Sequence, residues 1–408
     1  MRKLWLSLLL LITLHSSAQS YQKLHHEAIV IDTHNDVLST VTMRGLNIND
    51  DLSGKTHSDI NRFLKSGLDI QIFSIFCDER FGKDTAFKYA NIEIDSLYAI
   101  VARNRKQLML VKSAKELEEA VKQKKLGCMI GVEGGHMIED DLAKLEKLYQ
   151  RGARYLTLTW NNSTSWATSA WDETRMERAA RNASPSESEG PAPPVINQKP
   201  GLNEFGRSVV RKMNELGMIV DVSHVGEQTF RDVMSITTKP VIASHSCAHA
   251  LCPVPRNLKD DQIIAIKKNG GVVHLNFYSG FIDSNYTSRL RQFNSRHRSE
   301  IDSLKQLKWV NWEIEEWLAK QYPGEAENLR PSLSLLLDHL DHIVKLAGID
   351  HVGLGSDFDG ISSAPKGLED VTAFPLITKA LMERGYSDKD IRKILGENFI
   401  RVFKANQR

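Results

Sequence analysis

The stretch Ala28-Ile29-Val30-Ile31-Asp32-Thr33-His34-Asn35-Asp36 decides the fold, because an apolar run there leads directly into a His-x-Asp pair. Similar runs, rich in Val, Ile and Leu with little strict alternation, recur along the chain and are typical of parallel strands covered on both faces. The eight runs are Ala28–Asp32, Asp69–Phe76, Cys128–Glu133, Tyr155–Trp160, Met218–Ser223, Val241–Ser244, Val272–Asn276 and His351–Gly355. Segments with helical spacing separate most of them, such as Asp141–Arg151, Gly206–Leu216 and Asp260–Asn269. The pattern predicts an α/β fold, a (β/α)₈ TIM-type barrel, rather than an open doubly wound sheet.

Length and composition are compatible with one such barrel. The chain has 408 residues, of which 41% are hydrophobic and 25% charged, as in ordinary globular proteins. We expect a single domain over residues 19–408, with insertions near residues 171–201 and 284–330. The first insertion contains a Ser- and Pro-rich loop, and the second has a mostly helical pattern.

The N-terminus predicts export. Met1-Arg2-Lys3 precedes the apolar run Leu4–Leu14, which is too short to span a bilayer comfortably, and small residues follow at Ser16-Ser17-Ala18. We therefore expect residues 1–18 to be a signal peptide cleaved after Ala18, and a secreted or periplasmic protein without a stable membrane anchor. The alternative is an uncleaved N-terminal anchor.

Charge and cysteine content narrow the partners and crosslinks. The net charge of +2 and the lack of a long basic block argue against nucleic acid as a partner. Cys77 and Cys128 fall at opposite ends of neighbouring predicted strands and should not bond. Cys252 could pair with Cys247 or Cys77, but free buried thiols are at least as well supported.

Potential metal ligands follow five of the apolar runs. In a (β/α)₈ barrel these positions surround one mouth, at the C-terminal ends of the strands. We expect His34 and Asp36 to reach one ion, because residues two apart on a strand point the same way. The carboxylate of Glu133 can bridge two ions, and His224 and His245 would complete the ligand set of the second ion. Taken singly, each residue could instead be a hydrogen-bonded core histidine or a salt-bridged glutamate.

Mixed imidazole and carboxylate ligands predict two Zn²⁺ ions, with manganese and cobalt as alternatives. Two ions about 3.5–4 Å apart would lower the pKa of a bridging water and polarise a carbonyl, so hydrolysis by a bridging hydroxide follows. Glu133 and Asp357 are the expected catalytic residues, with Asp357 as proton carrier and Asp359 as its alternative. Arg256 could clamp a substrate carboxylate, or it could be a solvated surface arginine. Tyr278 could line the pocket.

With these residues in place, the chain resembles the membrane (renal-type) dipeptidases, the binuclear-zinc branch of the amidohydrolase superfamily. The resemblance covers essentially the whole mature chain. It is carried by His34-Asn35-Asp36, Gly131-Val132-Glu133-Gly134-Gly135-His136, Tyr155-Leu156-Thr157-Leu158-Thr159, Asp221-Val222-Ser223-His224-Val225, Ser244-His245-Ser246, Arg256-Asn257, Asn276-Phe277-Tyr278 and Asp357-Phe358-Asp359-Gly360.

The resemblance implies that His34 and Asp36 bind one zinc, that His224 and His245 bind the other, and that Glu133 bridges them. It implies that Arg256 contacts the C-terminal carboxylate of a dipeptide and that Asp357 contacts its amino group or relays a proton. Family members cleave dipeptides, often with a C-terminal D-residue, and commonly form homodimers.

One position departs from the family. Where the family often has a histidine that contacts the substrate, this chain has Trp160, which offers an indole donor but no titratable nitrogen. Asn161 or Asn162 could supply the missing donor, a hypothesis that the kcat of Asn→Ala variants would test.

Two other functions compete with a dipeptidase. One is another metal hydrolase of the same superfamily, acting on a lactone, a cyclic amide or a phosphotriester. Many of those use a bridging carboxylated lysine after the fourth strand, where this chain has no lysine. The other is a metal-retaining peptide-binding protein with little activity, for which Trp160 is the only hint.

Overall fold

The computed structural model describes residues 21–78, 81–180, 199–309 and 311–407. The expected signal peptide therefore lies outside the described residues. The described strands form one parallel sheet in the order β1-β2-β4-β5-β6-β7-β8-β9, and β3 pairs with the first three residues of β4. The strands are β1 Ile31–Asn35, β2 Ile70–Ile75, β3 Leu108–Leu110, β4 Leu126–Glu133, β5 Ala153–Thr157, β6 Ile219–Asp221, β7 Ile242–Ala243, β8 Val272–Leu275 and β9 Val352–Leu354.

The sheet closes on itself just beyond β9. Asn35 in β1 forms a parallel bridge with Phe358. The amide of Asp36 donates to Phe358 O at 2.8 Å, and the amide of Asp357 donates to His34 O at 3.0 Å. These bonds bring the segment after β9 against β1, which confirms the predicted eight-stranded (β/α)₈ barrel.

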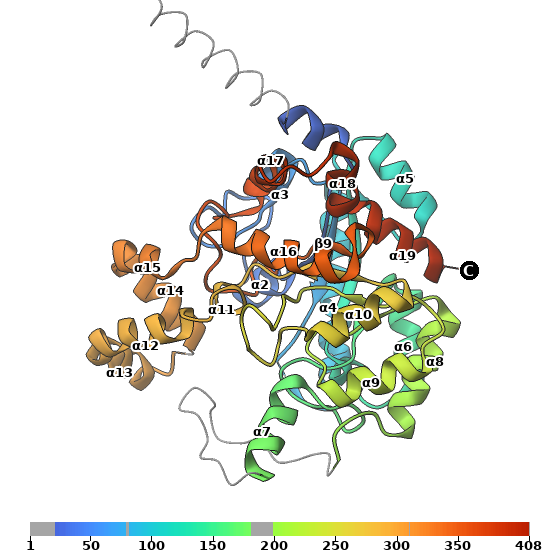
Figure 1. Cartoon of the computed structure of the whole chain (residues 1–408), viewed down its shortest axis with the longest axis horizontal. Helices are drawn as coiled ribbons and strands as arrows, with labels where there is room; N and C mark the ends of the chain where they lie inside the picture. Colours follow the sequence, from blue (N-terminus) through green and yellow to red (C-terminus); the bar gives the residue numbers. More distant parts are fainter. Residues whose placement is uncertain (1–20, 79–80, 181–198, 310, 408) are drawn as a thin grey trace, which may run out of the picture.

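The chain also forms helices, most of which surround the barrel on its outer face (Figure 1). They are α2 Val37–Arg44, α3 Ile60–Ser66, α4 Ala86–Arg103, α5 Ala114–Lys122, α6 Leu142–Gln150, α7 Ala170–Ala180, α8 Glu204–Leu216, α9 Glu227–Ile236, α10 Asp260–Asn269, α11 Ser279–Ile282, α12 Tyr286–Arg296, α13 Arg298–Gln306, α14 Asn311–Gln321, α15 Pro323–Leu329, α16 Leu333–Ala347, α17 Phe374–Glu383, α18 Asp388–Arg392 and α19 Asn398–Asn406. Local signals set their ends. The Asp141 side chain accepts the Ala143 amide at the start of α6, and Gly217 ends α8 at φ 82°.

Two apolar layers hold the barrel together. Inside it, strand residues such as Ile31, Ile72 and Ile219 pack with Phe399 and Phe403 of α19. Helix α19 therefore covers the interior of the barrel with apolar side chains from the C-terminal end of the chain. A larger cluster lies between the sheet and the surrounding helices. Both faces of each strand are thus buried, which explains why the strand sequences show apolar runs without alternation.

The strand bounds differ from the predicted ones by up to three residues, and two of these differences affect site residues. Strand β1 begins at Ile31, where pairing with Ile70 starts, so His34 lies within the strand and not after it. Strand β5 ends at Thr157, opposite Glu133, which leaves Trp160 in the following loop. The sequence did not indicate β3, a three-residue strand that pairs with β4 alone. All four cysteines are buried free thiols, which excludes the pairs left open for Cys252.

Helices α12–α15 project from one side of the barrel (Figure 1). This segment, residues 286–329, is called the excursion below. It has its own small core, with Tyr286, Phe293, Ile314 and Leu318 among its buried members. A salt bridge of 2.9 Å from Glu316 to Arg44 ties it to α2. No helix in the described part of the chain is both long and apolar enough to cross a membrane.

Candidate metal centre

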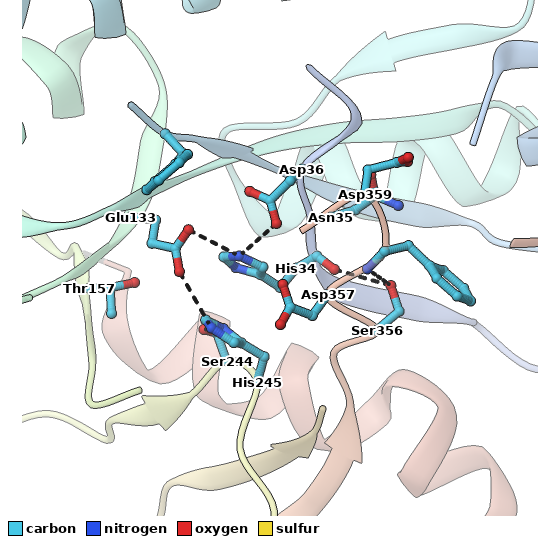
Figure 2. Close-up of polar contacts among 12 residues, drawn as sticks. His34, Asn35, Asp36, Glu133, Thr157, Ser244, His245, Ser356, Asp357 and Asp359 are labelled. Carbon is cyan, nitrogen blue, oxygen red and sulfur yellow. Dashed lines mark hydrogen bonds and ion pairs between the residues drawn. The ribbon is translucent and has the colours of Figure 1, made fainter. Parts of the chain in front are cut away.

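Five side chains from four strand ends converge at the mouth of the barrel, namely His34, Asp36, Glu133, His224 and His245; Figure 2 shows four of them, all except His224. Glu133 lies in the middle. Its Oε2 lies 3.6 Å from His34 Nε2, and its Oε1 lies 2.9 Å from His224 Nε2 and 3.4 Å from His245 Nε2. Asp36 Oδ2 lies 3.4 Å from His34 Nε2. The five residues predicted as metal ligands are therefore brought together in two overlapping groups that share Glu133.

Hydrogen bonds to the Nδ1 atoms turn the same nitrogen, Nε2, of each imidazole toward this centre. His34 Nδ1 lies 2.8 Å from the Tyr155 hydroxyl, which itself donates to Thr33 O at 3.1 Å. His245 Nδ1 lies 2.8 Å from Ser244 Oγ, which donates to Asp221 Oδ2 at 2.6 Å. Because both hydroxyl protons are used elsewhere, each hydroxyl accepts from an Nδ1–H group.

The third histidine follows the same rule. His224 Nδ1 lies 3.1 Å from Asn161 Oδ1, an oxygen that can only accept. All three rings are thus assigned the tautomer with hydrogen on Nδ1, which leaves the Nε2 lone pair facing the centre. This is the orientation that a metal-binding histidine requires.

The buried atoms at the centre fit a cation. His34 Nε2 and Asp36 Oδ1 are buried and have no hydrogen-bond partner. The Nε2 atoms of His224 and His245 face each other at 2.9 Å, although both are lone-pair acceptors in the assigned tautomer. Buried polar atoms without partners are rare, and two facing acceptors need a shared positive charge between them. The imidazole and carboxylate donors are those that zinc prefers.

The pKa shifts of the buried groups also fit a cation at this centre. Burial lowers the pKa of His224 to about 3, and Arg256 acts in the same direction, so this imidazole is neutral. Burial alone would raise the pKa of Glu133, but the neighbouring imidazoles of His34, His224 and His245 hold it well below its ordinary value. Burial would lower the pKa of His34, but Tyr155, Asp36 and Glu133 raise it well above its ordinary value. The buried carboxylates therefore stabilise a positive charge at the centre of the five side chains.

Backbone geometry at the rim is strained. His224 has a φ of 65° and Asp357 a φ of 60°, in the left-handed region that costs most residues about 1–3 kcal/mol. Gly360 leaves room between two carboxylates, because a Cβ there would lie 2.3 Å from Asp36 Oδ2 and 2.6 Å from Asp357 Oδ1. A glycine at this position keeps the centre open.

Asp357, and not Asp359, faces the centre (Figure 2). Asn276 Nδ2 donates to Asp357 Oδ2 at 2.7 Å, and burial raises the pKa of Asp357 well above its ordinary value. Asp359 Oδ1 instead accepts the His57 amide at 2.7 Å. The geometry therefore favours Asp357 over Asp359 as the group that meets a substrate.

Arg256 is buried near the centre, with 3% of its surface exposed, so the alternative of a solvated surface arginine is wrong. Its Nη2 donates to His245 O at 3.3 Å, its guanidinium lies over the Phe281 ring, and its buried Nε has no partner. Burial lowers its pKa to about 10. A buried cation with an unused donor is suited to an anionic ligand.

The two aromatic residues predicted at the pocket lie on different sides of it. Tyr278 packs edge-to-face on Phe281, the ring that carries Arg256, at 4.9 Å between centroids. Trp160 packs against Phe76 beyond β2, with ring centroids 4.9 Å apart. Asn161 Oδ1 accepts from His224. The donor that replaces the family's substrate-contacting histidine would therefore be Asn161 Nδ2 or the side chain of Asn162.

Sequence reasoning missed the orienting residues Tyr155, Asn161, Ser244 and Asp221. Three of them were quoted only as parts of motifs. A usable signal existed for Ser244 and Asp221, because a polar residue that ends a buried strand must find a partner across the rim. No comparable signal marked Tyr155, which is central in its strand and bonds to a residue 121 positions away.

Comparisons with known proteins support one family. The model of a family described as membrane dipeptidase (peptidase family M19) matches residues 18–408. A protein of Schizosaccharomyces pombe named as an uncharacterized dipeptidase is 32% identical over 406 residues, covering 95% of this chain and 83% of the relative.

Solved structures give the same result. A metallopeptidase from Rhodobacter sphaeroides, solved with a phosphinate mimic of the dipeptide L-Ala-D-Ala, superposes with a TM-score of 0.71 at 25% identity, covering 93% of this chain and 99% of that one. A probable dipeptidase from Pseudomonas aeruginosa gives a TM-score of 0.74 at 24% identity, covering 96% and 99% of the two chains, and supports the fold.

Proposed function

This chain belongs to the membrane dipeptidase family, peptidase family M19, and is a metal-dependent dipeptidase; we propose that it holds two zinc ions and accepts dipeptides with a C-terminal D-residue. The observation that carries the proposal is the common orientation of His34, His224 and His245, whose Nε2 atoms all face Glu133. Three imidazoles and two carboxylates supply enough ligands for two ions that share Glu133.

His34 and Asp36 would hold one ion, and His224 and His245 the other. When bound, two zinc ions would polarise the scissile carbonyl and lower the pKa of the attacking water. The residues around the ligands would hold them in position for the metal. Tyr155, Asn161 and Ser244 keep the imidazoles in the ligating tautomer, so that no reorganisation is needed during turnover.

The substrate would lie between Arg256 and Asp357. The guanidinium of Arg256 would bind the dipeptide's carboxylate, so we expect the substrate to need a free C-terminus. Asp357 would bind the free amine and carry a proton from the water to the leaving nitrogen. Asn276 fixes one oxygen of Asp357, so that the other, Oδ1, is left for this transfer. The proposed acceptance of a C-terminal D-residue is supported by the family resemblance and by the ligand of the Rhodobacter relative.

Hydrolysis of a dipeptide panel by the zinc-loaded mature chain tests this function. The panel pairs L-Ala-L-Ala with L-Ala-D-Ala and includes N-acetylated and amidated controls. We expect cleavage of both free dipeptides, no cleavage of blocked ones, and two zinc ions per chain by mass spectrometry. A chain with two metals that cleaves none of them would favour another hydrolase substrate or a binding role.

A further inference from the structure

The excursion forms a second hollow beside the metal centre. A cavity of about 300 Å³ lies between α12, α14 and α15 and the segment that follows β9. None of the five proposed metal ligands lines it. Its walls combine apolar side chains, among them Tyr286, Leu290, Phe293 and Leu329, with polar and charged ones.

One acidic side chain in this cavity has no cationic side chain paired with it among the described residues. Glu315, on α14, is partly buried, and its carboxylate accepts a hydrogen bond from Ser362. Among the described residues no lysine, arginine or histidine pairs with it, and burial raises its pKa. A carboxylate held in an apolar wall without a counter-charge gains most from a cationic ligand.

The arginine that lines the same cavity is already satisfied. Arg330 binds Glu327 at 2.9 Å and Glu369 at 3.0 Å, and it also donates to the carbonyls of Ala364 and Pro365. Its guanidinium is therefore committed to the rim of the cavity. The charge of Glu315 is the one that is left unbalanced there.

The cavity adjoins the Asp357 side of the centre. His57 lines it, stacks on Phe358 and accepts the Asp359 amide at 3.0 Å, so the cavity wall is joined to the loop that carries Asp357. Tyr278 connects the two sites, since its ring packs on Tyr286 of the cavity wall at 5.8 Å between centroids, and its amide donates to Asn276, which in turn donates to Asp357. A side chain that extends from a substrate amine held by Asp357 would pass Tyr278 toward Glu315.

We propose that this cavity is a specificity pocket for a basic side chain, lysine or arginine, on the N-terminal residue of the dipeptide, and that Glu315 is its anionic contact. The inference rests on the proposed function, which places the substrate amine at Asp357. The apolar walls would cover the methylene stem, and the Glu315 carboxylate would bind the terminal cation. Selectivity would then come from the excursion, and the reaction from the barrel rim.

The test compares kcat/KM of the zinc-loaded chain for Lys-Ala and norleucyl-Ala, which differ in the terminal ammonium group. A charge-assisted contact in a partly desolvated pocket predicts that Lys-Ala is preferred by about 10- to 100-fold. The reversed pair, Ala-Lys and Ala-norleucine, should be cleaved with similar efficiency. A ratio near one for the first pair, or a preference confined to the second pair, overturns the proposal without any variant.

Two matched variants locate the contact. Glu315→Gln keeps a hydrogen-bond acceptor for Ser362 and should reduce the Lys preference to within about threefold, with norleucyl-Ala turnover retained. Glu316→Gln removes the same charge one position along α14, where the carboxylate pairs with Arg44 and Lys320 outside the cavity, and should keep the preference. Equal ratios in the two variants would overturn the assignment to Glu315.

Failure of the pocket and failure of the function give different results. Cleavage of norleucyl-Ala without a Lys preference rejects the pocket alone. No cleavage of either peptide rejects the proposed function. The affinities of phosphinate mimics of the same two dipeptides, measured by calorimetry, then test whether the pocket binds a basic side chain. Binding of the lysyl mimic about tenfold or more tightly than the norleucyl mimic supports the pocket, and equal affinities reject it.

Discussion

Replacing Ser244 by Ala tests how far the metal centre depends on a preset tautomer. In the native chain Ser244 Oγ accepts from His245 Nδ1–H at 2.8 Å and donates to Asp221 Oδ2 at 2.6 Å. Without the hydroxyl, the metal-free ring can move its hydrogen to Nε2 and donate to Glu133, whose Oε1 lies 3.4 Å away. Metal binding must then return the hydrogen to an Nδ1 that has no acceptor.

The expected cost follows from that reversal. A buried donor left unpaired costs about 1–3 kcal/mol, and loss of such an outer partner weakens metal affinity about 10- to 100-fold, or about 1.4–2.7 kcal/mol. The ion held by His224 and His245 should weaken by this factor, while the ion held by His34 and Asp36 should change little. A competition titration with a zinc chelator measures both steps.

Ser356→Ala is the matched control. Ser356 Oγ donates to Asp32 Oδ2 at 2.6 Å, so the variant loses an equivalent buried serine–aspartate bond, but its hydroxyl contacts no imidazole. We expect similar losses of folding stability in the two variants and a loss of zinc affinity in Ser244→Ala alone. Native zinc affinity in Ser244→Ala, or equal losses in both variants, would refute the tautomer argument.

Three further changes have directions fixed by the structure. Gly360→Ala places a methyl group 2.3 Å from Asp36 Oδ2 and should lower zinc affinity by about tenfold or more in a titration, with an unchanged melting temperature of the metal-free chain. Arg256→Lys should lower kcat/KM for free dipeptides about 10- to 100-fold, because a lysine cannot bind a carboxylate bidentately; dipeptide amides should be cleaved equally poorly by both proteins. Burial lowers the pKa of His274 to about 4, below its ordinary 6.5, so the unfolded chain takes up more protons and stability falls as pH drops from 6.5 toward 4. Urea unfolding of the metal-free chain should show that His274→Gln removes about 2 kcal/mol of the loss between pH 7 and pH 5.

The barrel and its ligands could be predicted because both leave local marks in the sequence. A strand buried on both faces must be an uninterrupted apolar run, and in a parallel barrel every run ends at the same rim. His34, Glu133 and His245 each come at or after the end of such a run, so their convergence follows from topology without any tertiary contact being known. The error of about three residues in β1 did not matter, because His34 and Asp36 stay at the rim in either register.

The orienting residues could not be predicted in the same way, because their partners are chosen by three-dimensional distance. Tyr155 occupies a strand position where an apolar residue would pack equally well, and only the barrel interior brings its hydroxyl to His34. Asn161 lies in a loop whose path after Thr157 is set by contacts with Ser169 and Asp172. Loop geometry of this kind depends on specific tertiary hydrogen bonds and leaves no periodic pattern.

Two buried aspartates link strain at the rim to the chemistry. Asp221 accepts from the amide and hydroxyl of Ser244 and from the Ser223 amide beside the strained His224, whereas Asp32 accepts from the amide and hydroxyl of Ser356 beside the strained Asp357. Each carboxylate thus ties one strand end to a rim segment that holds a left-handed functional residue. Backbone strain of about 1–3 kcal/mol per residue persists only where the surroundings fix it, and these bonds are what fixes it. These bonds hold the rim in one conformation. Differences in substrate specificity are therefore expected to depend on elements outside the rim, and in our proposal that element is the excursion with Glu315.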